Sequence, residues 1–451
     1  MKNILIGAVL IFALLALAVM GSHVGSKPGL KHNSLHNRFQ RVRSALLDSP
    51  HTDFAVSLSN VTTPFGFVNV AAYGAVADGK TDNTAAFQNA LNSGAGKIFV
   101  PVGRYMFLGT FHVPPYTVLQ GAAEFPFSAF NGGSVLLAGM TGGNASANPF
   151  IFLQGPDAGL NGLTILYTQQ NLQASVPTVF PPCIQGSGDN LSILNMLLGN
   201  PYTAIDFATF SCSRHLIENV YGQPLALGIE VDQCYDIGRI RHVHFWPFWT
   251  SGSLLNWIHA NGITFLIKRS DWEVVSDVFS WGYNRGIVFD KSANGACNGQ
   301  FTDIDFDDVG VGIDVKHTQP YGIMFTNLNL ANAGDGDTKI AIRCAADSGA
   351  NVQMVVRGLV TWGDWNQAVN WACGGKFSLS DGIMQQWNSA FPAIEVTAGR
   401  VNLRGNYFTD NIGKAIRITV GVDRAIVTAN DLVGNSLVCE AQNSMCENNL
   451  A

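Results

Sequence analysis

The chain has 451 residues, a formal net charge of −6 and only 13% charged residues. It is long enough to bury a large core, and its mildly acidic balance without a basic run excludes nucleic acid as a partner. The 48 glycines and the low charge are typical of a β-rich exported protein rather than a helical cytosolic one.

The chain opens with a single lysine and then an apolar run, which predicts a secretory signal peptide over residues 1–21. The alternative is an uncleaved N-terminal anchor, because the run is about long enough to span a bilayer. In that case this segment would be the protein's membrane contact. Either interpretation predicts a secreted or cell-surface/periplasmic protein. Residues 22–65 are polar and irregular, and we expect a linker or arm there.

The stretch at 68–107 combines a helix with short strands. Its central part, around residues 82–93, has helical periodicity between candidate N-caps and a terminating glycine. The following KIFVPVGRYMF is typical of a strand, a Pro/Gly turn and a second strand.

From about residue 160 a repeat of about 23–30 residues takes over. Each unit has two short strands around one polar residue, a loop, and a third strand. The polar residues form a column: Asn195, Asn219, His242, Asp277, Asp303 and Asn327.

This repeat predicts an all-β fold, a single-stranded right-handed parallel β-helix of about ten coils with three strands per coil. Stacked coils bury a core that no single coil could bury alone. We expect the polar column to be structural, and the helix near 82–93 to cap the N-terminal end of the stack. The expected domains are the β-helix over 66–435 and a C-terminal tail over 436–451.

The stretch YGAVADGKTDNTAAFQNAL…GAGKIFVPVGRY resembles the opening of the pectate lyase superfamily, the rhamnogalacturonase/epimerase-like β-helix proteins. This family includes polygalacturonases, alginate epimerases and phage tailspikes. The resemblance implies the fold strongly and the reaction weakly, because the family contains lyases, hydrolases, epimerases and plain binders.

The stacking also predicts disulfides. Cysteines that follow the third strands of neighbouring coils should come within bonding range, which predicts Cys212–Cys234 and Cys344–Cys373. Cys439 and Cys446 should bond within the tail. Cys183 and Cys297 are left unassigned, and buried free thiols are the alternative for all of these residues. No metal site is expected, because no CxxC or HxxxH spacing occurs.

In family members that act on polymers, the substrate lies along the third-strand sheet, so the outward positions of that sheet are the candidate site. Two carboxyl groups such as Asp290 and Asp314 could raise each other's pKa and serve a hydrolase as acid and base. A lyase or epimerase would instead use Lys316 or Lys268 as base or cation, with Asp232, Asp290 and Asp314 as calcium ligands. Salt-bridged surface residues are the structural alternative.

Polygalacturonase chemistry does not transfer directly, because the family's Gly-His-Gly motif is absent and Leu227, Arg285 and Val311 stand where its first aspartate would be. Asp308 begins a loop toward the expected groove. Aromatic residues also recur in the loops before the third strands, either to stack on sugar rings or to pack under the loops. The predicted substrate-binding residues are Trp246, Trp249, Trp281, Tyr283, Arg285, Lys268 and Asp308.

The sequence thus predicts an exported β-helix that cleaves or modifies an acidic, uronate-containing polysaccharide as a lyase or epimerase. A calcium ion would be the cofactor of a lyase. A polygalacturonase-like hydrolase and a non-catalytic, tailspike-like glycan binder remain the alternatives.

Overall fold

The computed structural model describes residues 66–126, 129–247, 249–333 and 338–450. Contacts divide the chain into Met1–Leu58 and Ser59–Ala451. The predicted signal peptide at 1–21 and linker at 22–65 lie outside the described residues. Among the helices of the described part, none is long and apolar enough to cross a membrane.

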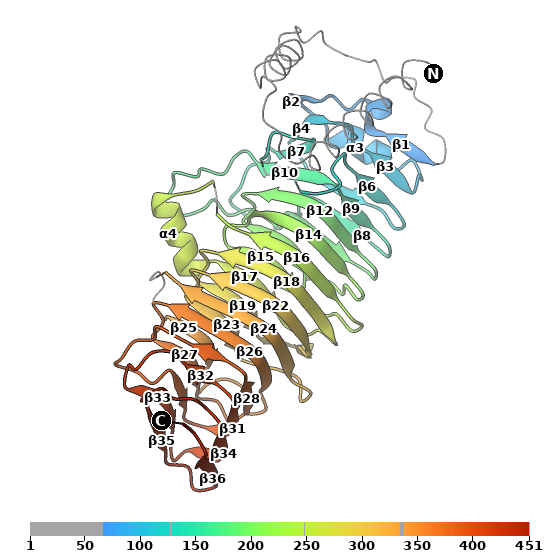
Figure 1. The fold of residues 1–451 in the computed structure, drawn as a ribbon. Helices are drawn as coiled ribbons and strands as arrows, with labels where there is room; N and C mark the ends of the chain where they lie inside the picture. Colours follow the sequence, from blue (N-terminus) through green and yellow to red (C-terminus); the bar gives the residue numbers. More distant parts are fainter. Residues whose placement is uncertain (1–65, 127–128, 248, 334–337, 451) are drawn as a thin grey trace, which may run out of the picture. The chain divides into compact units, whose positions relative to one another are not determined.

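The described residues form a right-handed parallel β-helix, as predicted (Figure 1). Its first wall, sheet A, has 21 strands and contains the first two strands of each coil. They are β1 (Phe67–Asn69), β2 (Asp78–Asp82), β3 (Lys97–Phe99), β4 (Gly103–Phe107), β6 (Val118–Gln120), β7 (Ser134–Ala138), β9 (Gly159–Asn161), β10 (Leu163–Tyr167), β12 (Ser192–Gly199), β14 (Leu216–Gln223), β16 (Arg239–Phe245), β18 (Glu273–Trp281), β22 (Gly299–Asp307), β24 (Ile323–Asn332), β26 (Gln353–Gly363), β28 (Lys376–Ser380), β29 (Ile383–Met384), β31 (Gly399–Arg404), β32 (Tyr407–Phe408), β34 (Val422–Thr428) and β36 (Ser444–Glu447).

The second wall, sheet B, has 13 parallel strands and contains the third strand of each coil. Its last strand lies in the segment expected as a tail, so the coils continue into that segment. The strands are β5 (Phe111–Val113), β8 (Ile151–Gln154), β11 (Ile184–Ser187), β13 (Thr203–Phe207), β15 (Leu227–Val231), β17 (Ile263–Ile267), β19 (Arg285–Phe289), β23 (Val311–Val315), β25 (Ile340–Cys344), β27 (Gln367–Trp371), β30 (Ile394–Val396), β33 (Lys414–Ile418) and β35 (Ser436–Cys439).

The remaining elements lie at the end and edges of this stack. A 3-10 turn, η1 (Val70–Tyr73), precedes the helix α3 (Thr84–Leu91), and Phe87 of α3 packs edge-on against Phe107 of the first coils. This helix is the predicted cap. A second helix, α4 (Gly252–Asn261), fills the long loop between β16 and β17, and a small hairpin joins β20 (Lys291–Ser292) to β21 (Gly295–Ala296).

The polar column lies at the corner between the two strands of sheet A, and Asn195, Asn219, Asp303 and Asn327 have the structural role expected of it. Every member has a positive φ, from 53° for His242 to 59° for Asn219, which Asn and Asp tolerate better than most residues. Asn219 donates to Asn195 (2.7 Å) and Asn327 donates to Asp303 (2.9 Å). Side-chain hydrogen bonds therefore join neighbouring coils at this corner.

Two of the three predicted disulfides are present. Cys344–Cys373 joins adjacent coils with a Cα–Cα distance of 5.7 Å, and Cys439–Cys446 closes the C-terminal end. The predicted Cys212–Cys234 bond is wrong: both thiols are buried and free, and the Cys212 thiol instead donates to the Gly186 carbonyl (3.1 Å).

Candidate functional site

The outer face of sheet B carries most of the charged residues predicted to be catalytic. The register places Glu230 beside Asp206 on one side and Leu266 on the other, while Asp314 lies beside Arg343. These positions therefore lie side by side on neighbouring coils. Their charges, however, are arranged in ion pairs between coils.

Asp290 and Lys316 form one of these pairs. Lys316 Nζ donates to Asp290 Oδ2 at 3.2 Å, and His317 Nδ1 lies 3.3 Å from Asp290 Oδ1. Burial alone would raise the pKa of Asp290, but the Lys291 backbone N–H and the Lys316 ammonium lower it overall. The expectation that Asp290 would share a raised pKa with Asp314 is therefore wrong, and Asp290 is an anion at neutral pH.

Asp314 is buried and belongs to a different group. Its Oδ2 lies 3.4 Å from Arg285 Nε and 3.9 Å from Arg343 Nη1. Burial lowers the pKa of Arg285, as does Arg343, while Asp314 raises it. Two guanidinium groups thus flank this carboxylate, while Arg285 Nη1 is buried without a hydrogen-bond partner among the described residues.

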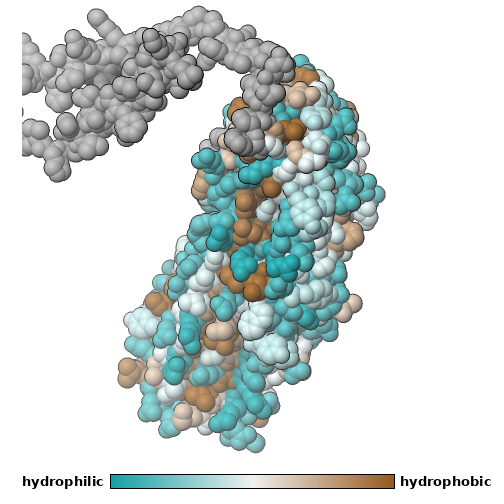
Figure 2. All heavy atoms as spheres, turned by 90° about the vertical axis from the view of Figure 1, so that its right-hand side faces the viewer, coloured by the Kyte–Doolittle hydropathy of each residue, from teal (hydrophilic) through white to brown (hydrophobic). Residues whose placement is uncertain are grey.

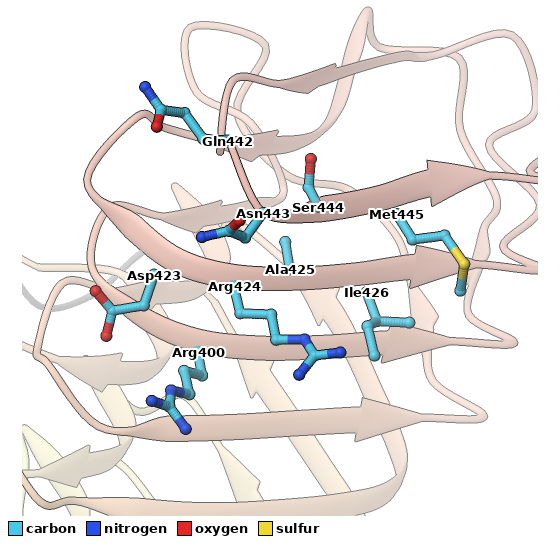
Figure 3. A pocket seen from close by; sticks show the side chains of 9 residues that line it. All are labelled: Arg400, Asp423, Arg424, Ala425, Ile426, Gln442, Asn443, Ser444 and Met445. Carbon is cyan, nitrogen blue, oxygen red and sulfur yellow. The ribbon is translucent and has the colours of Figure 1, made fainter.

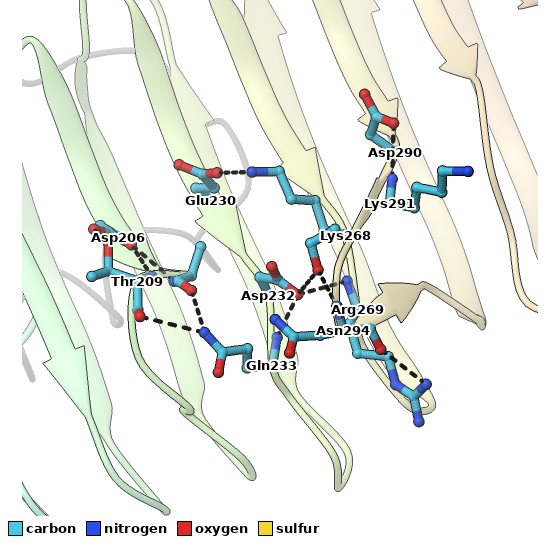
Figure 4. A network of polar contacts seen from close by, with 12 residues as sticks. Asp206, Thr209, Glu230, Asp232, Gln233, Lys268, Arg269, Asp290, Lys291 and Asn294 are labelled. Atoms are coloured by element: carbon cyan, nitrogen blue, oxygen red, sulfur yellow. Dashed lines mark hydrogen bonds and ion pairs between the residues drawn. The ribbon is translucent and has the colours of Figure 1, made fainter.

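Asp232 organises the turn after β15. It accepts hydrogen bonds from the backbone of Gln233 (2.8 Å) and Arg269 (3.1 Å) and from the Ser292 hydroxyl (3.0 Å). Figure 4 shows this network beside the pair in which Lys268 donates to Glu230 at 2.6 Å. These residues link adjacent coils.

Two predicted substrate-binding residues do not reach the surface. Tyr283 is 1% exposed and donates to the Pro224 carbonyl (2.8 Å), and burial raises its pKa well above its usual value. Asp308 is 3% exposed and accepts from the Ala333 backbone (3.1 Å). Both predictions are wrong, because these positions lie in tight turns under the loops. Trp249 is half-buried and packs on Phe130, with ring centroids 4.0 Å apart.

Trp246 and Trp281 lie at the end of the second strand of their coils, on the outer side of sheet A rather than over sheet B. Their rings are 5.9 Å apart. Trp246 also stacks on His244, and His259 of α4 lies edge-on to Trp281. The two tryptophans therefore extend an aromatic surface that the sequence interpretation did not include.

That surface, which we call the aromatic row, consists of Tyr221, His244 and Phe279. These residues pair in register across β14, β16 and β18. The ring centroids are 5.3 Å apart for Tyr221–His244 and 5.0 Å apart for His244–Phe279. Burial lowers the pKa of His244, so its ring is neutral near pH 7. The row thus presents three uncharged or weakly polar rings at the coil spacing.

A groove of about 300 Å³ runs over the aromatic row. Phe125, 58% exposed, forms one side of the groove and lies edge-on to Tyr221 at 5.6 Å. The lining also includes His242 and Asp277, whose Nε2 and Oδ2 atoms lie 2.6 Å apart. The groove therefore has an aromatic floor and two charged or polar side chains at its lining, the combination found in many ligand sites.

A carboxyl group and then an amide continue the row beyond Phe279. Asp305 pairs in register with Phe279, and Asn329 follows on the next strand. Burial raises the pKa of Asp305; an Asn329 hydrogen bond lowers it, and nearby Asp303 and Asp277 raise it further. Asp305 thus holds its proton more strongly than an ordinary aspartate does. Such environments are typical of catalytic acids, although ion networks also produce them.

A larger pocket of about 610 Å³ lies at the C-terminal end of the β-helix (Figure 3). Arg400 and Arg424 project side by side from paired positions of β31 and β34. Its lining residues include no aromatic ring. This pocket therefore offers no stacking surface for a sugar.

Figure 2 shows hydrophobic side chains in a broken band along the face in view, between polar side chains.

Sequence reasoning missed the aromatic row because it searched sheet B. The sequence does contain a signal for the row. Side chains alternate along a strand, so the side chain two residues after a column residue points outward on sheet A. Tyr221, His244, Phe279 and Asp305 all occupy that position.

Comparison with known proteins supports the resemblance seen in the sequence. Residues 67–171 match the family model described as rhamnogalacturonase A/epimerase, pectate lyase-like. The pre-neck appendage protein of Bacillus phage B103 is 37% identical over 70 residues, which are 16% of this chain and 8% of that protein. The chain thus covers less than a tenth of that relative's length.

Solved structures share the fold across most of the chain. Pre-mature bacteriophage phi29 gene product 12 is 17% identical, with a TM-score of 0.66 over 88% of this chain and 54% of that one. The A-module of the mannuronan C-5 epimerase AlgE6 from Azotobacter vinelandii is 13% identical, with a TM-score of 0.50 over 85% and 98% of the two chains. At these identities the likeness concerns the fold.

Proposed function

We propose that this right-handed β-helix protein, which resembles the pectate lyase superfamily, binds a polysaccharide across the aromatic row and hydrolyses it beside Asp305. The observation that carries this proposal is the groove over the aromatic row, together with Asp305, which pairs in register with Phe279 of the row and has a raised pKa. The phage relative and the epimerase fold support an extracellular or surface role on glycans. The two disulfides are also typical of exported proteins.

In this proposal the C–H faces of sugar rings stack on Tyr221 and Phe279. The protonated Asp305 donates to the glycosidic oxygen as the bond to that oxygen breaks. Asp277, in the lining of the groove, is the carboxylate placed to activate a water molecule. Two carboxyl groups with different environments thus take the two roles that glycoside hydrolysis requires.

The second candidate is a lyase or epimerase acting on a uronate polymer at sheet B. It is favoured by the cationic groups beside Asp290 and Asp314, since Lys316 and Arg285 could neutralise a uronate carboxylate. Asp232 and the two other carboxylates would be its calcium ligands. This candidate requires the ion pairs of sheet B to open when substrate binds.

Digestion of a glycan panel with two readouts tests these proposals. Hydrolysis creates reducing ends without new ultraviolet absorbance, whereas lyase action on a uronate creates an unsaturated, absorbing product. We expect reducing ends alone, lost at least about 100-fold in Asp305→Asn and retained in the matched control Asp290→Asn. Absorbing products lost in Asp290→Asn would favour the second candidate, and binding without products would identify a non-catalytic binder.

A further inference from the structure

Three buried side chains from separate coils meet in the turns that lead from sheet B to sheet A. His215 precedes β14, Cys234 follows β15, and Glu273 begins β18. All three are 0% exposed, and their ligand atoms lie within 4.8 Å of one another. His215 Nε2 is 3.1 Å from Glu273 Oε1.

Gly238 makes this meeting possible. Arg239 pairs with Leu216 on one side and Val274 on the other, so Gly238 stands between His215 and Glu273 in the stack. A Cβ at Gly238 would lie 2.4 Å from His215 Nε2 and 2.3 Å from Glu273 Oε2. The glycine therefore leaves room for two side chains, two coils apart, to face each other.

The outer contacts of these groups fix their orientation. His215 Nδ1 lies 2.9 Å from the Cys212 carbonyl oxygen, to which it donates. The Ser270 hydroxyl donates to Glu273 Oε2. Metal-binding histidines characteristically donate their other ring N–H to a carbonyl or carboxylate, and ligating carboxylates are themselves hydrogen-bonded. Nε2 is thus the ring atom left to face the thiol and the carboxylate.

We propose that His215 Nε2, Cys234 Sγ and a carboxylate oxygen of Glu273 bind a zinc ion that cross-links these coils. Imidazole, thiolate and carboxylate are all zinc ligands, and a tetrahedral ion would take its fourth ligand from water or the Ser270 hydroxyl. Burial of all three protein ligands favours an ion that holds the coils together over one that is open to substrate. The site is independent of the glycan proposal.

The metal content of the purified full-length chain tests this site. The protein is produced in zinc-supplemented medium, and bound metal is measured by mass spectrometry. A second sample is refolded with Co²⁺, whose thiolate complexes absorb in the near ultraviolet. Cys234→Ser removes one ligand, while Cys183→Ser alters a buried free thiol that is not among the three ligands and is the matched control.

We expect about one zinc ion per chain in the wild type and in Cys183→Ser, and less than about a tenth of that in Cys234→Ser. The cobalt band should follow the same pattern. A wild-type chain that contains no zinc and shows no cobalt band would overturn the proposal, and the cluster would then be a buried His215–Glu273 ion pair. This result does not depend on how any variant folds. Equal zinc in all three proteins would also overturn it.

Discussion

Removal of the Cys344–Cys373 disulfide should destabilise the β-helix more than removal of Cys439–Cys446. The first bond closes a sequence separation of 29 residues and the second a separation of 7. Loop-closure entropy in the unfolded chain then gives about 3.6 kcal/mol for the first bond and about 2.4 kcal/mol for the second. The difference of about 1 kcal/mol comes from loop length alone.

The perturbation is a pair of double variants, Cys344→Ala/Cys373→Ala and Cys439→Ala/Cys446→Ala. Alanine is chosen for the first pair because Cys344 and Cys373 are 0% and 1% exposed, and buried serine hydroxyls would add a desolvation cost. Urea unfolding followed by circular dichroism gives the midpoint and slope for each protein.

The expected order of stability is wild type, then the 439/446 variant, then the 344/373 variant. When all three proteins are unfolded under reducing conditions, the differences that come from loop closure should disappear. If the 344/373 variant unfolds at the wild-type midpoint, or if the order is reversed, this explanation by loop closure is refuted.

Two further predictions concern residues discussed above. Tyr283→Ala should lower the free energy of unfolding by about 3–5 kcal/mol because it removes a buried ring. Trp362 is 43% exposed, so Trp362→Ala should lower it far less. Urea unfolding midpoints of the two variants measure the losses, and equal losses would contradict the burial of Tyr283. The depressed pKa of Asp290 contributes stability above its unfolded pKa of about 3.9 that is lost as the pH falls through the folded value. Lys316→Met should therefore lower stability at pH 7 more than at pH 3, and an equal effect at both pH values would contradict the pair.

The repeat made the fold predictable because its alternation reports directly which residues face the core. The column of left-handed residues was recognisable because Asn and Asp recur there with the coil spacing. The Cys212–Cys234 error had a different cause: stacking brings cysteines near each other, but the direction of each thiol depends on the turn, and the Cys212 thiol turns toward a carbonyl.

The site was harder to predict, because side chains alternate between the core and the surface in both sheets. The alternation therefore does not indicate which sheet carries the site. Trp281 was assigned to a loop, yet β18 continues to it, so its ring joins the outer face of sheet A. His215, Cys234 and Glu273 show no metal-binding spacing, since their approach requires three coils and a glycine between them. Such contacts between distant residues become visible only when the coils are stacked in register.

The central claim, that a glycan lies across the aromatic row, is tested most directly by affinity. Binding of the polysaccharide selected by the panel is measured by calorimetry in an Asp305→Asn background, with Phe279→Ala as the variant and Glu230→Gln on sheet B as the control. Loss of one stacking ring should weaken binding about 2- to 13-fold, while the control binds unchanged. Unchanged binding by Phe279→Ala together with weakened binding by Glu230→Gln would contradict the account and place the glycan on sheet B.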